Sequence, residues 1–598
     1  MLSFVFVFLL CATPLFAQTL EPIRYTVSFP APHTHYVEVE ALVPTEGRVH
    51  VELMMAVWTP GSYMVREYSR QVEGFTATDP ARTVLSVEKT RKNRWRVTTG
   101  GAKTIRTHYR VYAHEMSVRT NWVDHEFALL NGAPTFITLL ESPSRRVHEV
   151  RVVLPPGWSQ SFSAMPTLGG ANTYAAPDYD TLVDSPILAG TPAAYEFQVT
   201  GKRHHLVSFG QRGVGNGSQA AQDLAKVVET TARFWGQMPF DRFHFFNVIG
   251  PVVNALEHRN STVIQAPRES PESRAGYLEW LSTAAHEYFH AWNVKRLRPV
   301  GLGPFDYENE VYTKSLWFVE GVTSYYGDLL LPRAGVVTPQ EYLGALSSEI
   351  RSVQTTPGRL VQSVEMASYD AWIKYYRQDE NTANTSISYY VKGAVVGFLL
   401  DAKLRRVTNG ARSLDDVMRL MYRRFSGARG FTDEDLRAAI IEVGGQAPAR
   451  ELRTWLDRIL ETTAELDYAE ALDWFGLRLA PPPEPPRPWL GLAVRTDRQR
   501  TIVSEVRRES PAFAAAVSVG DEITAIGGMP VRPGDLAARV EELAPGARMT
   551  LSLMRGDAAI DVTVTLGSDP GHPWWLGIAP TASREQQQRL AAWLGTGP

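Results

Sequence analysis

Cysteine is almost absent from this chain. Its 598 residues contain a single cysteine, Cys11, which lies in an apolar run at the amino terminus. Bulky Leu10 precedes it where lipid attachment requires a small residue, so a lipid anchor is disfavoured. Without further thiols the chain can form no disulfide framework and no cysteine nucleophile. Its stability must come from packing, and any catalysis must use other groups.

A strong net charge and long apolar segments are also missing. The 61 basic and 64 acidic residues leave a formal charge of -3, which excludes a general attraction to nucleic acid or to an anionic membrane. Beyond the amino terminus, no segment has the roughly 18 apolar residues needed to span a bilayer. The composition, 44% hydrophobic and 21% charged, is that of a soluble protein, and the length predicts several domains.

The amino terminus predicts export. Residues 1 to 17 form an apolar run that ends in the small residue Ala17, the layout of a secretory signal peptide. We therefore expect a periplasmic or secreted protein. No Lys or Arg precedes the run and Leu15 is not small, so the alternative is an uncleaved segment that holds the chain at a membrane.

Hydrophobic periodicity divides the rest of the chain and predicts a multidomain α+β fold. Short alternating runs over residues 18 to 205 indicate a β-rich domain, which we expect to be a β-sandwich. Residues 206 to 333 mix helical and strand patterns, and residues 334 to 480 are mainly helical. A proline-rich linker at 481 to 488 leads to a small β-domain at 489 to 568. The tail, 569 to 598, is too short for a domain, and we assign it no function.

The segment HEYFH at 286 to 290 carries the main chemical signal. His286 and His290 are four residues apart, which places both imidazoles on one face of a helix, within reach of one metal ion. Glu287 lies on the neighbouring face, where a carboxylate can take a proton from an activated water. The alternative is a core helix with a satisfied histidine pair, but burying these groups unpaired costs several kcal/mol.

A catalytic zinc needs a third protein ligand from another element. Glu320 lies in the strongly apolar segment SLWFVEGVTSYY, where a lone carboxylate is expensive to bury without a cation. The alternative is an exposed glutamate on a surface helix. Two imidazoles and one carboxylate favour zinc over other metals.

Two further residues can complete a peptidase site. Glu257, in NALEH, can hold a cationic amino group, the feature that separates an aminopeptidase from an endopeptidase. Tyr390 opens an apolar helix, and its hydroxyl can donate to the oxyanion formed when water attacks a carbonyl. The alternatives are an ordinary surface charge for Glu257 and a packing role for Tyr390.

These motifs together resemble a known family. HEYFHAWNVKRLRP, FVEGVTSYY, LEHRNST, YYVKG and WTPGSY are similar to the glycyl aminopeptidase family of zinc peptidases, and the likeness spans the chain in order. It implies an amino-terminal β-domain, a thermolysin-like catalytic domain, a helical domain and a carboxy-terminal PDZ domain. It also implies a single zinc ion on His286, His290 and Glu320, with Glu287 as general base, Glu257 as amino-group anchor and Tyr390 as the transition-state tyrosine. The larger relatives typified by aminopeptidase N have a shorter spacer before the third ligand than residues 291 to 319.

One departure from the family pattern concerns specificity. Asn254 and Ala255 stand where the family usually has two glycines before Leu-Glu-His. Glycine is used where backbone must approach a partner closely, so these side chains should crowd the substrate. The family's preference for amino-terminal glycine or alanine is an implied expectation here.

The carboxy-terminal module resembles a PDZ domain through WLGLAV at 489 to 494 and the later helix DLAARVEEL. In that interpretation, the amides around Leu490, Gly491 and Leu492 form a nest for a peptide carboxylate, and the peptide adds as a strand. The alternative is a small β-domain packed permanently on the catalytic unit.

The sequence therefore predicts a zinc aminopeptidase acting on peptides. A zinc endopeptidase that ignores Glu257 is one alternative, and a PDZ-based peptide-binding scaffold with a structural metal site is another. Glu287 argues against the scaffold, because a structural site needs no base beside an open coordination position.

Overall fold

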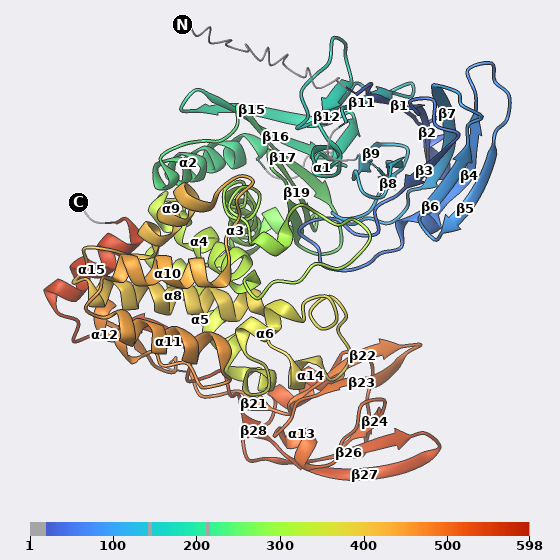
Figure 1. Ribbon diagram of the computed structural model, residues 1–598. Coiled ribbons are helices and arrows are strands. Elements are labelled where there is room, and N and C mark those ends of the chain that lie inside the picture. The colour runs from blue at the N-terminus through green and yellow to red at the C-terminus, as the bar shows by residue number, and fades with distance from the viewer. Residues whose placement is uncertain (1–19, 142–145, 211–215, 483, 597–598) are drawn as a thin grey trace, which may run out of the picture.

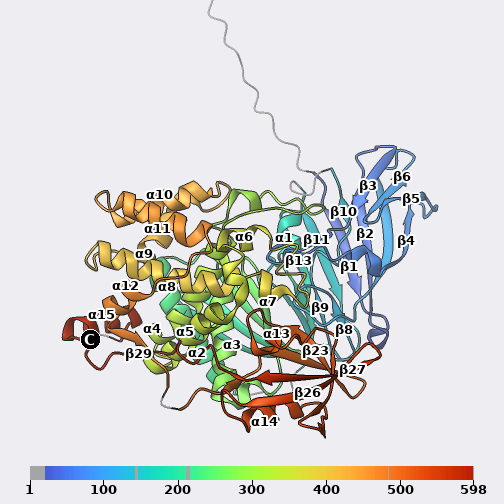
Figure 2. The same cartoon turned by 90° about the horizontal axis from the view of Figure 1, so that it is seen from below.

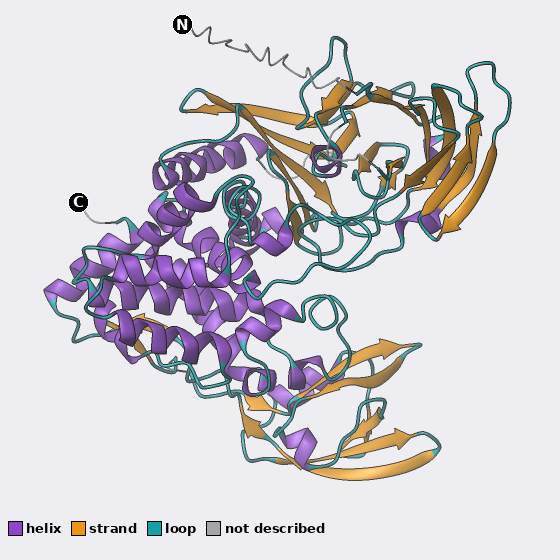
Figure 3. Cartoon of the chain, in the orientation of Figure 1, coloured by secondary structure: helices purple, strands orange, loops and turns teal. Residues whose placement is uncertain are grey.

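The computed structural model describes residues 20–141, 146–210, 216–482 and 484–596. The expected signal peptide lies outside these residues. Figure 1 shows a β-rich amino-terminal part, a central part dominated by helices, and a small β-rich part near the carboxy terminus, and Figure 3 shows the same division by secondary structure. Within the described ranges, no helix is long and apolar enough to cross a membrane.

The amino-terminal part is built from sheets that share one core. A six-stranded sheet faces a four-stranded sheet, and buried side chains of both form a single apolar cluster. Alternation explains this, because residues 105, 107, 109 and 111 of one long strand are buried while their neighbours are exposed. The strands in sheet order are β13 (Thr173–Ala176), β11 (His148–Val153), β1 (Ile23–Ser28), β2 (Tyr36–Pro44), β7 (Thr104–Tyr112) and β4 (Val72–Thr78), then β10 (Thr138–Leu139), β3 (His50–Met54), β6 (Arg94–Thr98) and β5 (Ser86–Arg91).

A second four-stranded sheet and a five-stranded sheet connect this part to the centre. The first consists of β12 (Gln160–Ser163), β14 (Ile187–Gly190), β9 (Phe127–Leu130) and β8 (Trp122–Val123), with the short helix α1 (Tyr179–Val183) nearby in the chain. The second runs β15 (Ala193–Val199), β16 (Lys202–Phe209), β17 (Arg242–Ile249), β19 (Ser261–Ala266) and β18 (Asn254–Glu257). The boundary expected after residue 205 falls inside β16, because alternation reveals a strand but not the sheet it joins.

Helices cover this five-stranded sheet and continue into one large core. The predicted helix over the HEYFH segment is confirmed as α3, which begins after Ser273, whose side chain accepts from the Gly276 amide. The helices are α2 (Gly217–Trp235), α3 (Arg274–Phe289), α4 (Val322–Arg333), α5 (Pro339–Thr355), α6 (Val364–Tyr369), α7 (Thr382–Thr385), α8 (Tyr389–Val407), α9 (Leu414–Phe425), α10 (Asp433–Gly444), α11 (Ala449–Glu461) and α12 (Ala469–Phe475). A π-helical turn, Trp317–Gly321, leads directly into α4.

The chain leaves the helical core to form the small β-rich part and then returns to that core. Its sheet contains β22 (Leu492–Asp497), β23 (Arg500–Val506), β24 (Glu522–Ile526), β26 (Arg548–Arg555) and β27 (Ala558–Thr565), with β25 (Met529–Pro530), α13 (Pro511–Ala514) and α14 (Asp535–Glu541). At its base, β21 (Pro488–Trp489) pairs with β28 (Gly567–Ser568).

The segment after this module is part of the helical core rather than a free tail. β29 (Leu576–Ile578) pairs with β20 (Leu477–Leu479), and α15 (Arg584–Leu594) lies against the helices (Figure 2). Trp593 of α15 is 0% exposed, and its ring stacks on Phe475 with centroids 4.2 Å apart. Residues 569–596 therefore help to hold the centre together.

Candidate metal centre and catalytic cavity

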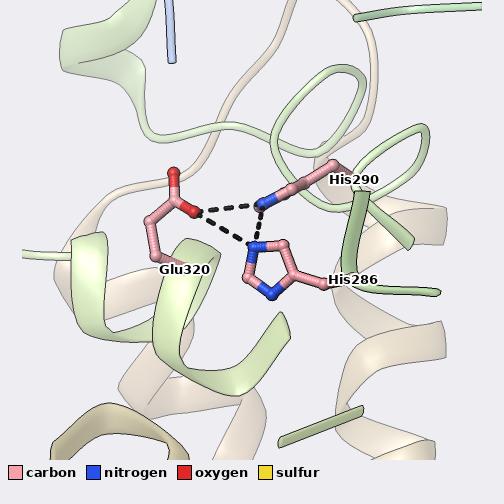
Figure 4. Close-up of side chains that lie close together, drawn as sticks. All are labelled: His286, His290 and Glu320. Atoms are coloured by element: carbon pink, nitrogen blue, oxygen red, sulfur yellow. Dashed lines mark hydrogen bonds and ion pairs between the residues drawn. The ribbon is translucent and has the colours of Figure 1, made fainter. Parts of the chain in front are cut away.

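Two helical elements bring three metal-binding side chains to one point (Figure 4). His286 lies in the last turn of α3 and His290 directly follows it, while Glu320 comes from the π-helical turn before α4. Nε2 of His290 lies 2.9 Å from Nε2 of His286 and 3.0 Å from Oε2 of Glu320. The remaining distance, from His286 Nε2 to the same carboxylate oxygen, is 3.7 Å. The structure thus assembles the three predicted ligands as one donor set.

The hydrogen bonds behind the imidazoles orient them for a metal. Nδ1 of His290 donates to the Asn293 carbonyl at 2.7 Å, since a carbonyl can only accept. The Ser324 hydroxyl donates to the Glu320 carbonyl at 3.1 Å, which leaves its oxygen to accept from Nδ1 of His286 at 3.3 Å. Both protons therefore sit on Nδ1, and both Nε2 lone pairs face Glu320.

These donors fit a zinc ion. Two lone pairs and a carboxylate oxygen repel one another at such distances unless a cation lies between them. The other carboxylate oxygen of Glu320, Oε1, is buried and has no hydrogen-bond partner in the described chain. Burial raises the pKa of Glu320 and positive charge beside it lowers that pKa; a protonated His290 supplies such charge, and so would a zinc ion. A buried, ionised carboxylate between two unprotonated Nε2 atoms is the ligand set that zinc prefers.

Glu287 shares a cavity with the metal donors. The cavity has a volume of about 320 Å³, and His286, Glu287, His290 and Glu320 line it. Glu287 is 6% exposed, and burial raises its pKa, with Glu257 and Glu320 adding to the effect. Its Oε2 has no hydrogen-bond partner among the described residues, so this oxygen is free to interact with a molecule in the cavity.

Glu257 reaches the same cavity from the edge strand β18. It is 4% exposed, and its Oε1 is unpartnered within the described ranges. The nearest cation, Lys295, lies 3.8 Å from that oxygen but 2.7 Å from Asp184. Lys295 is therefore engaged mainly by Asp184, and the Glu257 carboxylate keeps a free oxygen.

A glycine of the amino-terminal part lies close to the carboxylate of Glu257. Gly61, in the WTPGSY segment, has a φ of +89°, and a Cβ there would lie 2.4 Å from Oε1 of Glu257. A Cβ at that distance would displace the Glu257 carboxylate, and the positive φ also favours glycine here. The predicted catalytic site is thus completed by a residue of the first domain.

Tyr390 lies at the start of α8 and lines the cavity. Its ring centroid is 6.2 Å from that of His286, and burial raises its pKa well above the ordinary value. The position of α8 depends on a glycine contact, because a Cβ on Gly321 would lie 2.5 Å from Cα of Gly393. The two helices that carry Glu320 and Tyr390 can approach so closely only through these glycines.

Asn254 and Ala255 also line the cavity, and they are joined by a residue that sequence reasoning missed. Arg119, from the amino-terminal part, donates from Nη1 to Oδ1 of Asn254 at 3.0 Å and from Nη2 to the Ala255 carbonyl at 3.4 Å. Its Nε donates to Oγ of Ser62 at 2.7 Å. Arg119 therefore holds β18 against the first domain, and no sequence motif around Arg119 predicts this role.

Further cavity residues escaped prediction as well. They are single side chains on elements far apart in the chain, namely Ser282, Asp328, Glu349, Tyr375 and Tyr376. The tyrosines precede α8 in a segment that also contacts the first domain, since Tyr376 donates to the Gly61 carbonyl at 3.3 Å.

The predicted carboxylate loop of the small β-domain is a separate site. Leu490 and Gly491 lie between β21 and β22, and Leu492 begins β22, an edge strand of its sheet. The Leu490 carbonyl accepts from Ala512 N at 3.0 Å, and the Gly491 carbonyl accepts from Arg507 N at 2.9 Å. These bonds fix the loop beside a strand edge that no other described strand covers.

The fold and the donor set together indicate a metallopeptidase, with the general-base candidate Glu287 next to His286 at the end of α3 and the other candidate metal ligand, His290, directly after that helix. Comparisons with known proteins narrow this class. Residues 279–396 match the M61 glycyl aminopeptidase family, residues 24–191 match the peptidase M61 N-terminal domain, and residues 488–566 match a PDZ domain. The crystal structure of an aminopeptidase N family protein from Idiomarina loihiensis is similar over 96% of this chain and 100% of its own, with 30% identity and a TM-score of 0.87. The chain belongs to the M61 glycyl aminopeptidase family and is a metallo-aminopeptidase.

Two other similarities are more distant or more local. An M1 zinc metallopeptidase from Deinococcus radiodurans is 13% identical, over 75% of this chain and 95% of that one, with a TM-score of 0.46. A periplasmic serine endoprotease of the DegP-like type from Brucella suis is 34% identical over 98 residues, 16% of this chain. The chain spans only 18% of the length of that protein.

Proposed function

We propose that the protein is a zinc-dependent aminopeptidase that removes small amino-terminal residues, glycine or alanine, from peptides. A single zinc ion would be held by His286, His290 and Glu320. The observation that carries this proposal is the carboxylate of Glu257, whose buried Oε1 accepts no hydrogen bond from the described residues and which lies in the same cavity as the metal donors and Glu287. A buried negative charge near the reaction centre is what an amino-terminal ammonium group needs.

The residues around the metal have separate roles in the proposed reaction. When bound, zinc supplies Lewis-acid chemistry and makes a water more acidic. Glu287 takes the proton of the attacking water and later delivers it to the leaving amine. Tyr390, which burial keeps protonated, donates a hydrogen bond to the carbonyl oxygen as negative charge develops there.

Glu257 determines where the substrate is cut. Its free oxygen pairs with the ammonium group and so fixes one residue between the amino terminus and the cleaved bond. Asn254 limits the size of that residue, because its side chain is held at the cavity wall by Arg119 rather than free to rotate away.

A comparison of free and blocked substrates tests this function. We expect hydrolysis of a glycyl peptide with a free amino group, no hydrolysis after chelation, and a loss of orders of magnitude on acetylation. Glu257→Gln, which keeps the size and removes the charge, should lose activity on free-amine substrates by roughly ten- to a hundredfold. Equal turnover of acetylated and free peptides, measured by mass spectrometry, would reject the aminopeptidase assignment in favour of an endopeptidase.

The PDZ domain is proposed to bind peptide carboxy termini at Leu490, Gly491 and Leu492. The support is the uncovered edge of β22 beside this loop, to which a peptide can add as a strand. Binding should require a free carboxylate, so peptides with an amidated carboxy terminus serve as the control in fluorescence polarisation.

Export is proposed from the signal-like residues 1 to 17. Cell fractionation, with intact-mass measurement of the amino terminus, would distinguish a cleaved, exported protein from one retained at the membrane by an uncleaved segment.

A further inference from the structure

The catalytic cavity extends beyond the metal donors to a pair of acidic side chains. Glu320, Ser324 and Asp328 follow one another at intervals of four residues, so they lie along one side of α4 and the turn before it. All three line the cavity, as do Ser282, one turn before His286 on α3, and Glu349 of α5. The helical rise places Asp328 about 12 Å along the axis from Glu320.

This acidic pair has no counter-charge. Neither Asp328 nor Glu349 has a Lys, Arg or His nitrogen within ion-pair distance in the part of the chain that the structure describes. Asp328 accepts one hydrogen bond, from Ser282. Glu349 faces the cavity and makes no side-chain hydrogen bond among these residues, and burial, with Asp328 nearby, raises its pKa to about 7. Both carboxyl groups are partly shielded from water, and two neighbouring carboxylates repel each other when both are ionised, a repulsion that a cation between them would relieve.

The chemistry of the missing cation can be narrowed. A zinc ion takes three or four protein ligands, and the described residues form one group of three or more metal-binding side chains, the His286, His290 and Glu320 set. An ammonium or guanidinium group, by contrast, is well satisfied by two carboxylates. The pair therefore suits an organic cation.

The position of the acidic pair in the cavity indicates which part of a bound peptide it would contact. α3 runs from Ser282 through His286 toward His290, and Lys295, which follows, lies beside Glu257. Glu257 is therefore at one end of the cavity and Ser282, with Asp328, at the other, with the metal donors between them. If the substrate amino group is at Glu257, the residues after the cleaved bond extend toward Asp328 and Glu349.

We propose that Asp328 and Glu349 form a subsite for a lysine or arginine side chain in the first or second residue after the cleaved bond. This inference rests on the proposed aminopeptidase function, because Glu257 sets the direction of the substrate. The preferred substrates are then peptides with a small amino-terminal residue followed closely by a basic one.

The test compares lysine with norleucine, which has a similar chain without the charge. Peptides that begin with glycine carry either residue at the second or third position. We expect kcat/KM to be higher for lysine by about tenfold at one of these positions. Glu349→Gln and Asp328→Asn should each reduce this lysine-to-norleucine ratio toward one. Glu279→Gln removes an exposed carboxylate from α3 and should leave the ratio unchanged.

Several outcomes would overturn the inference. Equal kcat/KM for lysine and norleucine at both positions, in an enzyme that cleaves free-amine peptides, would reject the subsite and leave the proposed function standing. A lysine preference that survives in both variants would assign it to other residues. A second zinc ion lost in both variants would show that the pair binds metal. Failure to cleave any free-amine peptide would remove the proposed function, and this inference with it. Should Asp328→Asn fail to fold, Glu349→Gln still decides, since it breaks no hydrogen bond.

Discussion

Adding a single methyl group at Gly61 should impair the binding of the substrate amino group by Glu257 without affecting the binding of zinc. In Gly61→Ala the new Cβ would lie 2.4 to 2.7 Å from the three carboxylate atoms of Glu257. Ordinary contacts begin beyond 3 Å, so the carboxylate must move by about 1 Å or the backbone must shift. Misplacement by about 1 Å in an active site can cost on the order of a hundredfold in rate. The three atoms nearest the new methyl group all belong to Glu257 and none to a metal ligand, so zinc content should stay unchanged.

The backbone contribution can be separated with a matched control. Gly61 has a φ of +89°, where alanine is strained by roughly 1 to 2 kcal/mol. Gly101 has a φ of +86° and only an ordinary contact, at 3.8 Å. Gly101→Ala should therefore lower the free energy of unfolding by a similar amount without changing activity. The difference in kcat/KM between the two variants then measures the effect of the contact with Glu257.

The assay is kcat/KM on a free-amine glycyl substrate, together with metal content and urea unfolding. We expect Gly61→Ala to lose activity by ten- to about a hundredfold with full zinc. In a Glu257→Ala background, where the carboxylate is gone, the same substitution should cost little further activity. Full activity of Gly61→Ala would refute the argument, since it would mean that Glu257 does not need this position.

Three further predictions concern the metal centre and acid stability. Glu287→Gln should retain zinc and the fold but lose nearly all activity, because an amide cannot accept a proton; an active, zinc-loaded variant would exclude Glu287 from the mechanism. Glu320→Ala should release the metal, as should His286→Ala, and elemental analysis showing full zinc in both would mean that the ligands are misassigned. Burial lowers the pKa of His148 to about 4, so the unfolded chain binds a proton that the folded chain excludes. The free energy of unfolding should therefore fall by about 3 kcal/mol as the pH drops from about 6.5 to 4. In urea titrations, His148→Phe should make the free energy of unfolding less dependent on pH over this range. The same pH dependence in the variant would contradict the prediction.

The candidate metal ligands could be picked out from the sequence because their signals are local. His286, Glu287 and His290 lie within two turns of one helix, so helical periodicity alone places them relative to one another. Glu320 was found through a different signal, a charge in an otherwise apolar segment, which is unfavourable unless something pairs with it. The structure brings these residues together, and the family implied by the same motifs is confirmed by the match over residues 279–396.

Most of the remaining cavity residues could not be found in this way. Arg119 lies in a loop of the first domain, and its contact with Asn254 spans 135 positions of the sequence. Glu349 has an ordinary position on the amphipathic helix α5, where a carboxylate normally faces water. Asp328 lies in the apolar helix α4 that follows Glu320, and the same signal, a charge in an apolar segment, could have indicated it. Their importance depends on which helices pack together, and hydrophobic patterning shows which face of a helix is buried without showing its partner.

The chain returns to the helical core after the PDZ domain, so this domain is attached to the core at both of its ends. The PDZ domain is an insertion held at both ends, since β21 pairs with β28 and β20 pairs with β29. Asn384 of α7 also donates to the Val506 carbonyl at 2.9 Å and accepts from the Arg508 amide at 2.7 Å. The domain therefore lacks the free swing of a module at the end of a linker.

The same topology determines how the two activities can be dissected. A chain stopped at the proline-rich linker would also lose α15, whose Trp593 donates at 2.8 Å to the hydroxyl of Tyr325 on α4, the helix that follows Glu320. Removal of one such buried tryptophan costs about 3 to 5 kcal/mol, so that truncation would weaken the metal centre by itself. Replacing residues 480–575 by a short glycine-containing turn that joins the antiparallel strands β20 and β29 keeps α15 in place. The peptidase can then be measured without its insertion.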